Sequence, residues 1–181
     1  FSRERIRIAV IDGGSAVGDW PAAAAETPGL LTARLAQEAI ERAPLKASAI
    51  ECLYLANQAV AQELDRMKIP PAQRQALCSS AALVCNITRP DRFCDVTVQY
   101  ASLGDCRLAI RRAAGWDWPT MGNVERFERA EIRAAMKAAQ QADAPLSRVL
   151  NRIHEFPTVQ GVILKHRLLE NSPAGDGYGA L

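Results

Sequence analysis

The sequence lacks the features that mark several large protein classes. No uninterrupted apolar run approaches the roughly 20 residues that a membrane-spanning helix needs. The first residues, Phe-Ser-Arg-Glu-Arg, do not form a signal peptide. They also lack a Met, so we expect a section or a processed product of a longer protein. The formal net charge is only +2, which gives no general attraction to nucleic acid or anionic membranes. We therefore expect a cytoplasmic protein without a nucleic-acid or membrane partner.

The cysteines lack the spacing of metal or redox motifs. There are five, none of them in a CxxC pair, and the odd count leaves at least one outside any disulfide: Cys52, Cys78, Cys85, Cys94 and Cys106. Several fall within apolar runs, where a thiol behaves as a small hydrophobic group. We expect five free thiols in a reducing compartment.

What remains is the composition of one ordinary globular domain. The 181 residues are 49% hydrophobic and 23% charged, and the length suffices for a real hydrophobic core. No internal repeat or low-complexity segment interrupts the chain. We therefore treat residues 1–181 as a single domain.

The first half of the chain predicts a strand and two helices. Residues 5–11 begin with alternating polarity and end wholly apolar, which indicates a strand that enters the core and stops at a turn beginning with Asp12. Thr27-Pro28 is a typical helix start, with an apolar face of Leu31, Leu35 and Ala39. A second helix is expected over about 48–66, with a stripe of Ile50, Leu53, Val60 and Leu64 that also contains Asn57.

The middle of the chain predicts three strands. Residues 80–87 are mostly apolar and suit a strand buried on both faces, whereas residues 94–100 alternate between apolar and polar. A tight turn over 102–105 precedes a third strand over 106–111, with Leu108 and Ile110 on one face. We expect an antiparallel meander.

The last third of the chain is helical. The helical pattern starts at Asn123, and further helices begin near Pro145 and Pro157. An apolar stripe is formed by Leu146, Val149, Leu150 and Ile153, and residues 171–179 have loop composition. Together with the strands, this order predicts a layered α+β domain.

Two acidic turns are the candidates for chemistry. Asp12-Gly13 ends an apolar strand, and Gly104-Asp105 lies in the turn of the meander. Each places a carboxylate at the end of a rigid strand, and such oxygen ligands suit Mg²⁺ or Mn²⁺. Because both dipeptides are also common in ordinary turns, spacing alone leaves a structural role open.

Several segments, in the right order, resemble the PPM (protein phosphatase 2C) family of metal-dependent protein phosphatases. Residues 7–14, Arg-Ile-Ala-Val-Ile-Asp-Gly-Gly, are similar to its strand ending in Asp-Gly-x-Gly-Gly, and residues 99–111 to its Ala-x-x-Gly-Asp-Ser-Arg segment. Residues 78–81, Cys-Ser-Ser-Ala, stand where the family has Gly-[Ser/Thr]-Thr-Ala. Residues 166–178 resemble an Arg-Asn-x-Pro-x-Gly-Tyr stretch of bacterial members. The resemblance covers 5–111 best.

The resemblance implies an antiparallel β-sandwich flanked by helix pairs, in four αββα layers. Residues 5–111 would form its core, 112–171 a helical flap-like region and 172–181 a loop tail. The implied activity is hydrolysis of phosphorylated Ser/Thr proteins, opposite a Ser/Thr kinase, with two or more Mg²⁺ or Mn²⁺ ions. Asp12 would bridge two metals, Gly13 would offer its carbonyl oxygen, and Asp105 would reach the same cluster. Two such ions activate a water and need no side-chain nucleophile.

Other parts of the family pattern have no counterpart in the chain. These are the early acidic residue, the phosphate-binding Arg, the late Asp-Gly after a strand and the acidic pair near the C-terminus. Asp176-Gly177 follows a loop and is not a substitute, and Gly14 replaces the His of many eukaryotic members. Two alternatives therefore stay open: an inactive PPM-like module that binds a phosphoprotein or regulatory partner, and a different α+β domain with similar turns.

The remaining candidates have plainer interpretations. His154 and His166 have no partner at metal-ligand spacing, and Cys106 has no visible base. Trp116 and Trp118 suit either a recognition flap or a packing or hinge role. The glycines after Asp12 are not a phosphate-binding loop, because no Gly-Lys-Ser/Thr follows. If Asp12 and Asp105 serve one metal cluster, their carboxylates should lie within roughly 10 Å at one edge of the domain.

Overall fold

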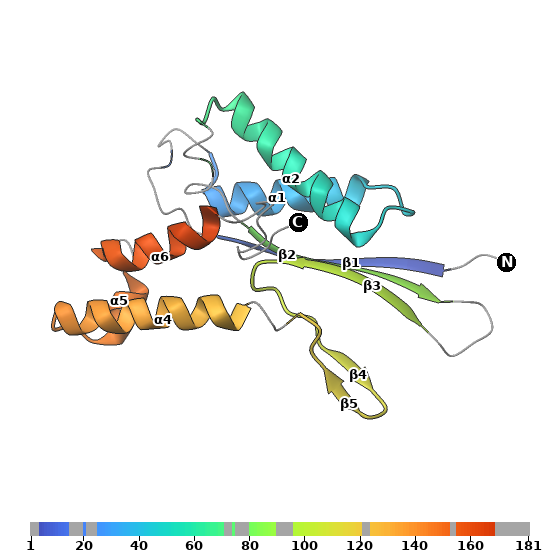
Figure 1. Ribbon diagram of the computed structural model, residues 1–181. Helices are drawn as coiled ribbons and strands as arrows, with labels where there is room; N and C mark the ends of the chain where they lie inside the picture. The colour runs from blue at the N-terminus through green and yellow to red at the C-terminus, as the bar shows by residue number, and fades with distance from the viewer. Residues whose placement is uncertain are drawn as a thin grey trace.

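The computed structural model describes residues 4–14, 20, 25–70, 74, 80–89, 96–120, 124–152 and 155–168. Within these ranges the protein is an α+β structure with antiparallel sheets, as the sequence predicts (Figure 1). No helix in the described ranges is long and apolar enough to cross a membrane.

A three-stranded antiparallel sheet forms the centre of the fold. Its order is β1 (Glu4–Gly13), β2 (Ser80–Arg89) and β3 (Thr97–Leu103). The central strand β2 is buried over five consecutive residues, which explains its continuous apolar run. The expected strands over 5–11 and 80–87 are confirmed, and the described part of 94–100 lies in or directly before β3.

Two expectations about the strands are wrong. Asp12 does not begin a turn: β1 continues through Gly13 because β2 starts at Ser80 and supplies partners to both residues. Residues 106–109 do not return beside β3. Instead β4 (Ile110–Arg112) pairs with β5 (Gly115–Asp117) across a two-residue turn. This local hairpin competes with the long-range pairing that the alternation of apolar residues had suggested.

Helices α1 (Pro28–Arg42) and α2 (Ala49–Arg66) begin at the predicted caps. The Thr27 side chain accepts a hydrogen bond from the Leu30 N–H. Ser48 and Glu51 form a capping box, in which each side chain accepts from the other residue's backbone N–H. Both helix starts were therefore readable from the local sequence.

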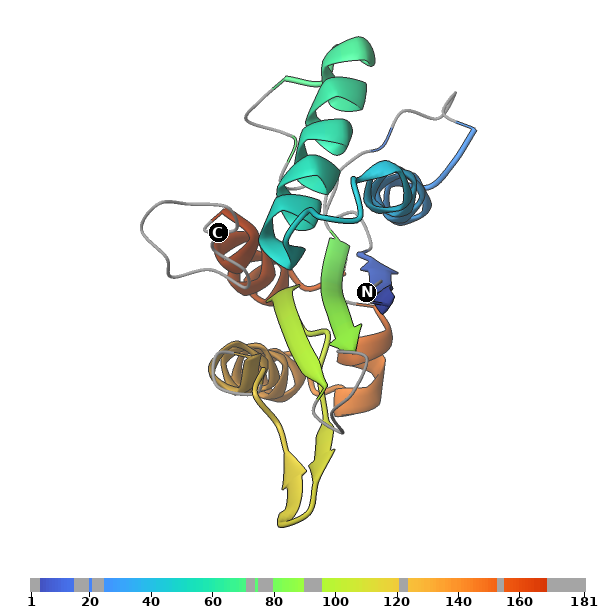
Figure 2. The same cartoon turned by 90° about the vertical axis from the view of Figure 1, so that its right-hand side faces the viewer.

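These two helices cover one face of the sheet with mostly small residues (Figures 1 and 2). On α2 the buried positions are Ala49, Cys52, Leu53, Ala56 and Leu64. The expected stripe is wrong at Ile50, which is 60% exposed. Small side chains let the helix and the sheet approach closely. A prediction based on large apolar residues overlooks these small buried positions. On α1, Leu31 is buried as expected, while Leu35 and Ala39 are only partly so.

A second apolar cluster joins the helices of the last third: α4 (Val124–Gln141), α5 (Leu146–Asn151) and α6 (Pro157–Leu168). Their predicted starts are confirmed. The cluster buries Ala135, Ala138, Ala139, Val149 and Val159. Of the expected stripe, Val149 is buried, whereas Leu146 and Leu150 are exposed. Ile153 and the expected loop tail over 171–179 lie outside the described residues. Figure 1 shows these helices beyond one end of the sheet, and the β4–β5 hairpin below the sheet, on the side away from α1 and α2.

Candidate functional site

Asp12 and Asp105 come together at one end of the sheet. Asp12 pairs with Ala81 on the central strand, and Leu103 pairs with Ala82, the next residue of that strand. A Cβ atom added to Gly104 would lie 2.6 Å from the Ala81 Cβ, so the turn before Asp105 passes directly beside Ala81. Neighbouring strands lie about 4.8 Å apart, so the backbone of Asp12 and the turn at Gly104 are separated by roughly 10 Å. Both acidic residues thus lie at the same end of the sheet, as expected, and the distance between their carboxylates stays a prediction.

Cys106 lies close enough to both carboxylates for their charges to act on its thiol. Its Sγ–H donates a long hydrogen bond, 3.9 Å, to the Val10 carbonyl of β1. The pKa of its thiol is raised, first by burial and then by the negative charges of Asp105 and Asp12, while a backbone hydrogen bond with Asp12 opposes the shift. Both carboxylates therefore act on one sulfur atom. A raised pKa favours the protonated thiol.

Gly104 is required by the turn that positions Asp105. Its φ is +74°, in the region that favours glycine, and a side chain there would also collide with Ala81. The Gly-Asp order is thus a consequence of the close approach of the β3 turn to β2. In the sequence, Gly104-Asp105 was visible only as a dipeptide that is common in turns.

The first turn of α1 lies against the end of β1. A Cβ added to Gly13 would lie 2.1 Å from the Gly29 carbonyl oxygen, and one added to Gly29 would lie 2.8 Å from the Gly13 and Gly14 carbonyl oxygens. The glycines thus allow the helix to start directly beside the end of β1, on the face of the sheet opposite to the Asp12 side chain. The Gly13 carbonyl faces Gly29, and its role as a metal ligand stays a prediction. Sequence reasoning missed Gly29, whose signal was a glycine in the first helical turn after Thr27-Pro28.

The acidic end is accessible to solvent. The side chains of Asp12 and Asp105 are both exposed, so a hydrated divalent cation can approach them. Two carboxylates are fewer ligands than a metal cluster needs. Within the described ranges, no three His, Cys, Asp or Glu side chains converge as a metal-binding group. His154 and the side chain of His166 lie outside the described residues.

The cysteines agree with the sequence prediction as far as they are described. Cys52, Cys85 and Cys106 are free thiols. Burial raises the pKa of the Cys52 and Cys85 thiols, which are inert core groups. Cys78 and Cys94 lie outside the described residues.

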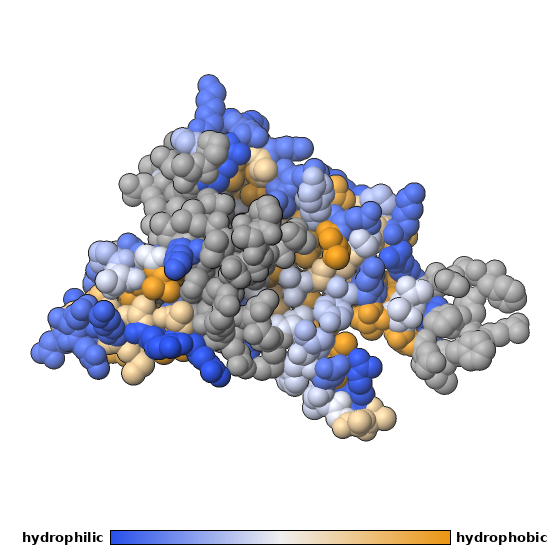
Figure 3. Space-filling model, in the orientation of Figure 1, coloured by the Kyte–Doolittle hydropathy of each residue, from blue (hydrophilic) through white to orange (hydrophobic). Residues whose placement is uncertain are grey.

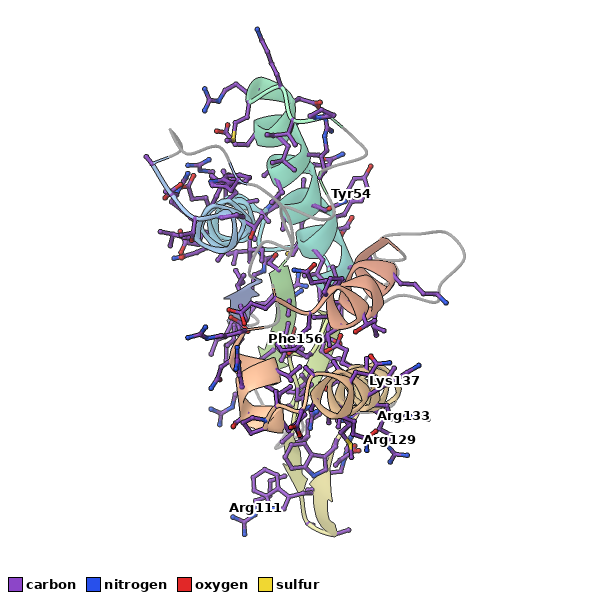
Figure 4. All side chains as sticks on the ribbon, turned by 90° about the vertical axis from the view of Figure 1, so that its left-hand side faces the viewer. Tyr54, Arg111, Arg129, Arg133, Lys137 and Phe156 are labelled. Atoms are coloured by element: carbon purple, nitrogen blue, oxygen red, sulfur yellow. The ribbon has the colours of Figure 1, made fainter. Side chains whose placement is uncertain are left out.

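The two tryptophans lie on the β4–β5 hairpin and are exposed. Trp116 is 63% and Trp118 49% exposed, with ring centroids 6.5 Å apart. This exposure argues against a packing role, and the recognition and hinge roles stay predictions. Arg111 pairs with Trp116 in register and projects from the hairpin, while Arg129, Arg133 and Lys137 extend from one side of α4 (Figure 4).

Comparison with protein-family models, with curated protein sequences and with solved structures finds no match for this chain.

Proposed function

We propose that the chain is part of a PPM-type phosphoprotein phosphatase that hydrolyses phosphorylated Ser or Thr side chains with Mg²⁺ or Mn²⁺. The observation that supports this best is the meeting of Asp12 and Asp105 at one end of the sheet, although 93 residues separate them in the sequence. Their carboxylates would hold divalent ions, and Gly13 would add a carbonyl oxygen. Such ions supply an activated water and neutralise the phosphoryl oxygens.

The sandwich architecture belongs to the same proposal. Alternation along β1 turns Ile6, Ile8 and Val10 away from α1 and α2, toward the same face as Asp12. These three side chains are 48%, 50% and 55% exposed. An apolar sheet face of this kind needs a cover, and the second sheet of a sandwich would supply one.

The three free thiols fit the cytoplasmic location that we propose.

Metal titration tests the proposal. Calorimetry with Mn²⁺ should detect binding to the chain, and Asp12→Asn or Asp105→Asn should weaken it at least about tenfold, because each removes one of few charged ligands. Asp65→Asn is the matched control, since Asp65 is an exposed carboxylate on α2. Unchanged Mn²⁺ affinity in both site variants would refute the metal assignment.

A non-catalytic PPM-like module is the second candidate. It is favoured by the lack of a three-ligand metal group within the described ranges. Hydrolysis of an aryl phosphate with Mn²⁺, abolished by EDTA, would support the enzyme. Mn²⁺ binding without hydrolysis would favour the binding module.

A further inference from the structure

The strand β1 has an open edge. In the order β1-β2-β3, β1 pairs only with β2, and no other described strand lies along its outer side. The pairing with β2 is continuous from Glu4 to Gly13, without a bulge, and the strand contains no proline. Apart from Val10 and Asp12, whose backbone groups bond Cys106, an edge of this length presents unpaired backbone N–H and C=O groups to an extended chain that approaches it.

A groove runs along this edge, between β1 and α1. Its volume is about 750 Å³. Ala9 and Ile11 form part of one wall, and Leu30, Ala33 and Gln37 of α1 form part of the other. Figure 2 shows α1 above β1. The side chains of an added strand that point toward the helices would therefore enter the groove.

The opposite face of an added strand would meet apolar surface as well. Ile6, Ile8 and Val10 are about half exposed on the face that points away from the helices. Figure 3 shows hydrophobic side chains that reach the surface below the sheet. Every second residue of an added strand would extend this apolar face.

The helix side of β1 carries two arginines, beside a groove whose lining also includes Arg34 and Glu41. Arg5 and Arg7 point toward the helix side, and among the described residues neither pairs with a carboxylate. Arg7 donates only to backbone carbonyls and to Asn86. Arg5 donates to the Ala47 carbonyl at 3.4 Å, and its Nε is buried without a hydrogen-bond partner in the described structure. A carboxylate across from these arginines would complement both charges.

We propose that the outer edge of β1 binds an extended acidic and apolar polypeptide segment as a fourth strand. Main-chain hydrogen bonds to β1 supply affinity, apolar side chains fill the groove beneath α1, and acidic side chains face Arg5 and Arg7. This binding function goes beyond the proposed phosphatase activity and does not depend on it.

A second copy of the chain fits this edge less well. Antiparallel pairing of β1 with its own copy would bring two α1 helices over neighbouring strands, about 5 Å apart. Packed helices need 8–10 Å between their axes. A segment that carries no covering helix avoids this collision.

A defined peptide probes the edge. The probe is a fluorescein-labelled octapeptide with valine at every second position and two glutamates and two alanines between them. Fluorescence anisotropy should detect saturable binding, and hydrogen exchange should show protection of β1 amides between Arg5 and Ile11. Leu30→Glu removes an apolar wall and adds a like charge, so we expect at least about tenfold weaker binding. Ala33→Trp fills the groove from a second position and should have the same effect.

The controls distinguish peptide binding in the groove from nonspecific binding. Leu150→Glu changes a similarly exposed leucine on α5 and should leave the affinity within about twofold. A peptide with lysine in place of glutamate should bind at least about tenfold more weakly. Absent peptide binding, or binding that neither Leu30→Glu nor Ala33→Trp weakens, would overturn the proposal. A molecular mass in solution that corresponds to a dimer, together with slow hydrogen exchange of the β1 amides in the absence of peptide, would assign the edge to a second copy instead.

Discussion

The Nε of Arg7 donates a 3.0 Å hydrogen bond to Oδ1 of Asn86, the residue directly opposite it on β2. Asn86 is 1% exposed, and its Nδ2 donates to the Ala47 carbonyl and to Gln99 Oε1. The remaining Arg7 donors reach the carbonyls at and after the end of α1: Ile40, Ala43, Pro44 and Ala47. One side chain thus links β1 and β2 to the end of α1 and to the segment that follows it.

We expect Arg7→Ala to lower the free energy of unfolding by about 3 kcal/mol, because Asn86 Oδ1 and the Ala43 carbonyl lose their donor and three further carbonyls lose one of two or more donors. Arg7→Lys should recover less than half of this loss, since an ammonium cannot reproduce the spread of a guanidinium. Urea unfolding measures both. In a double-mutant cycle, Arg7→Ala and Asn86→Ala should be strongly non-additive. Additive losses would show that the two side chains do not act as one unit.

The capping box of α2 predicts a pH-dependent stability. The pKa of the Glu51 carboxyl is lowered, first by its hydrogen bond from the Ser48 backbone and then by that from the Ser48 side chain. A lowered pKa in the folded state means that the ionised group stabilises the fold above its ordinary value of 4.5, and that this stabilisation is lost as the pH falls further. Glu51→Gln should therefore lower Tm at pH 7 but not at pH 3. A deficit of equal size at both pH values would contradict the charged cap.

Local sequence signals predicted the elements better than their pairing. The starts of α1 and α2 follow from Thr27-Pro28 and from Ser48 with Glu51, because a cap is encoded within four residues. The prediction of a third strand in the meander was wrong, because the alternation at Leu108 and Ile110 indicates a strand without showing which strand it pairs with. The contact of Gly13 with Gly29 also joins two elements across the fold, so only the structure revealed it.

The candidate site shows the same division. The Asp-Gly and Gly-Asp dipeptides identified Asp12 and Asp105 as candidates in the sequence. That both residues lie beside Ala81 could be known only from the register of the three strands. The Arg7–Asn86 contact had only a weak signal, a buried asparagine in an apolar strand. Its partner could not be read from the sequence, since it lies 79 residues away.

Gly104 offers a test of the turn that holds Asp105. Gly104→Ala adds a side chain where φ is +74° and where Ala81 leaves no room, so we expect a loss of about 2 kcal/mol or more. Gly161→Ala is the matched control, because nothing lies within 4 Å of the added atom and the position is helical. It should be neutral or stabilising by up to about 1 kcal/mol. Equal effects of the two substitutions in thermal unfolding would argue against the close approach of Gly104 to Ala81.

The reactivity of Cys106 tests the meeting of Asp12 and Asp105 without any metal. Both carboxylates raise the pKa of its thiol, because a negative charge nearby disfavours the thiolate. Removal of either charge should lower that pKa and increase the thiolate fraction at pH 8. Since the thiolate is the nucleophile, iodoacetamide should then alkylate Cys106 faster. We expect Asp105→Asn and Asp12→Asn each to accelerate the reaction, with the double variant fastest.

Peptide-resolved mass spectrometry follows Cys106 separately from the buried Cys52 and Cys85. Asp117→Asn is the control, because Asp117 lies on the hairpin and pairs with Arg112. The Asp12 variant decides the question: Asp105 adjoins Cys106 in the sequence, whereas Asp12 affects the thiol only if the fold brings β1 beside it. An unchanged rate in Asp12→Asn would separate the two carboxylates and remove the geometric basis of the proposed metal centre. Acceleration in both site variants, with no change in the control, would place one sulfur atom within reach of both charges.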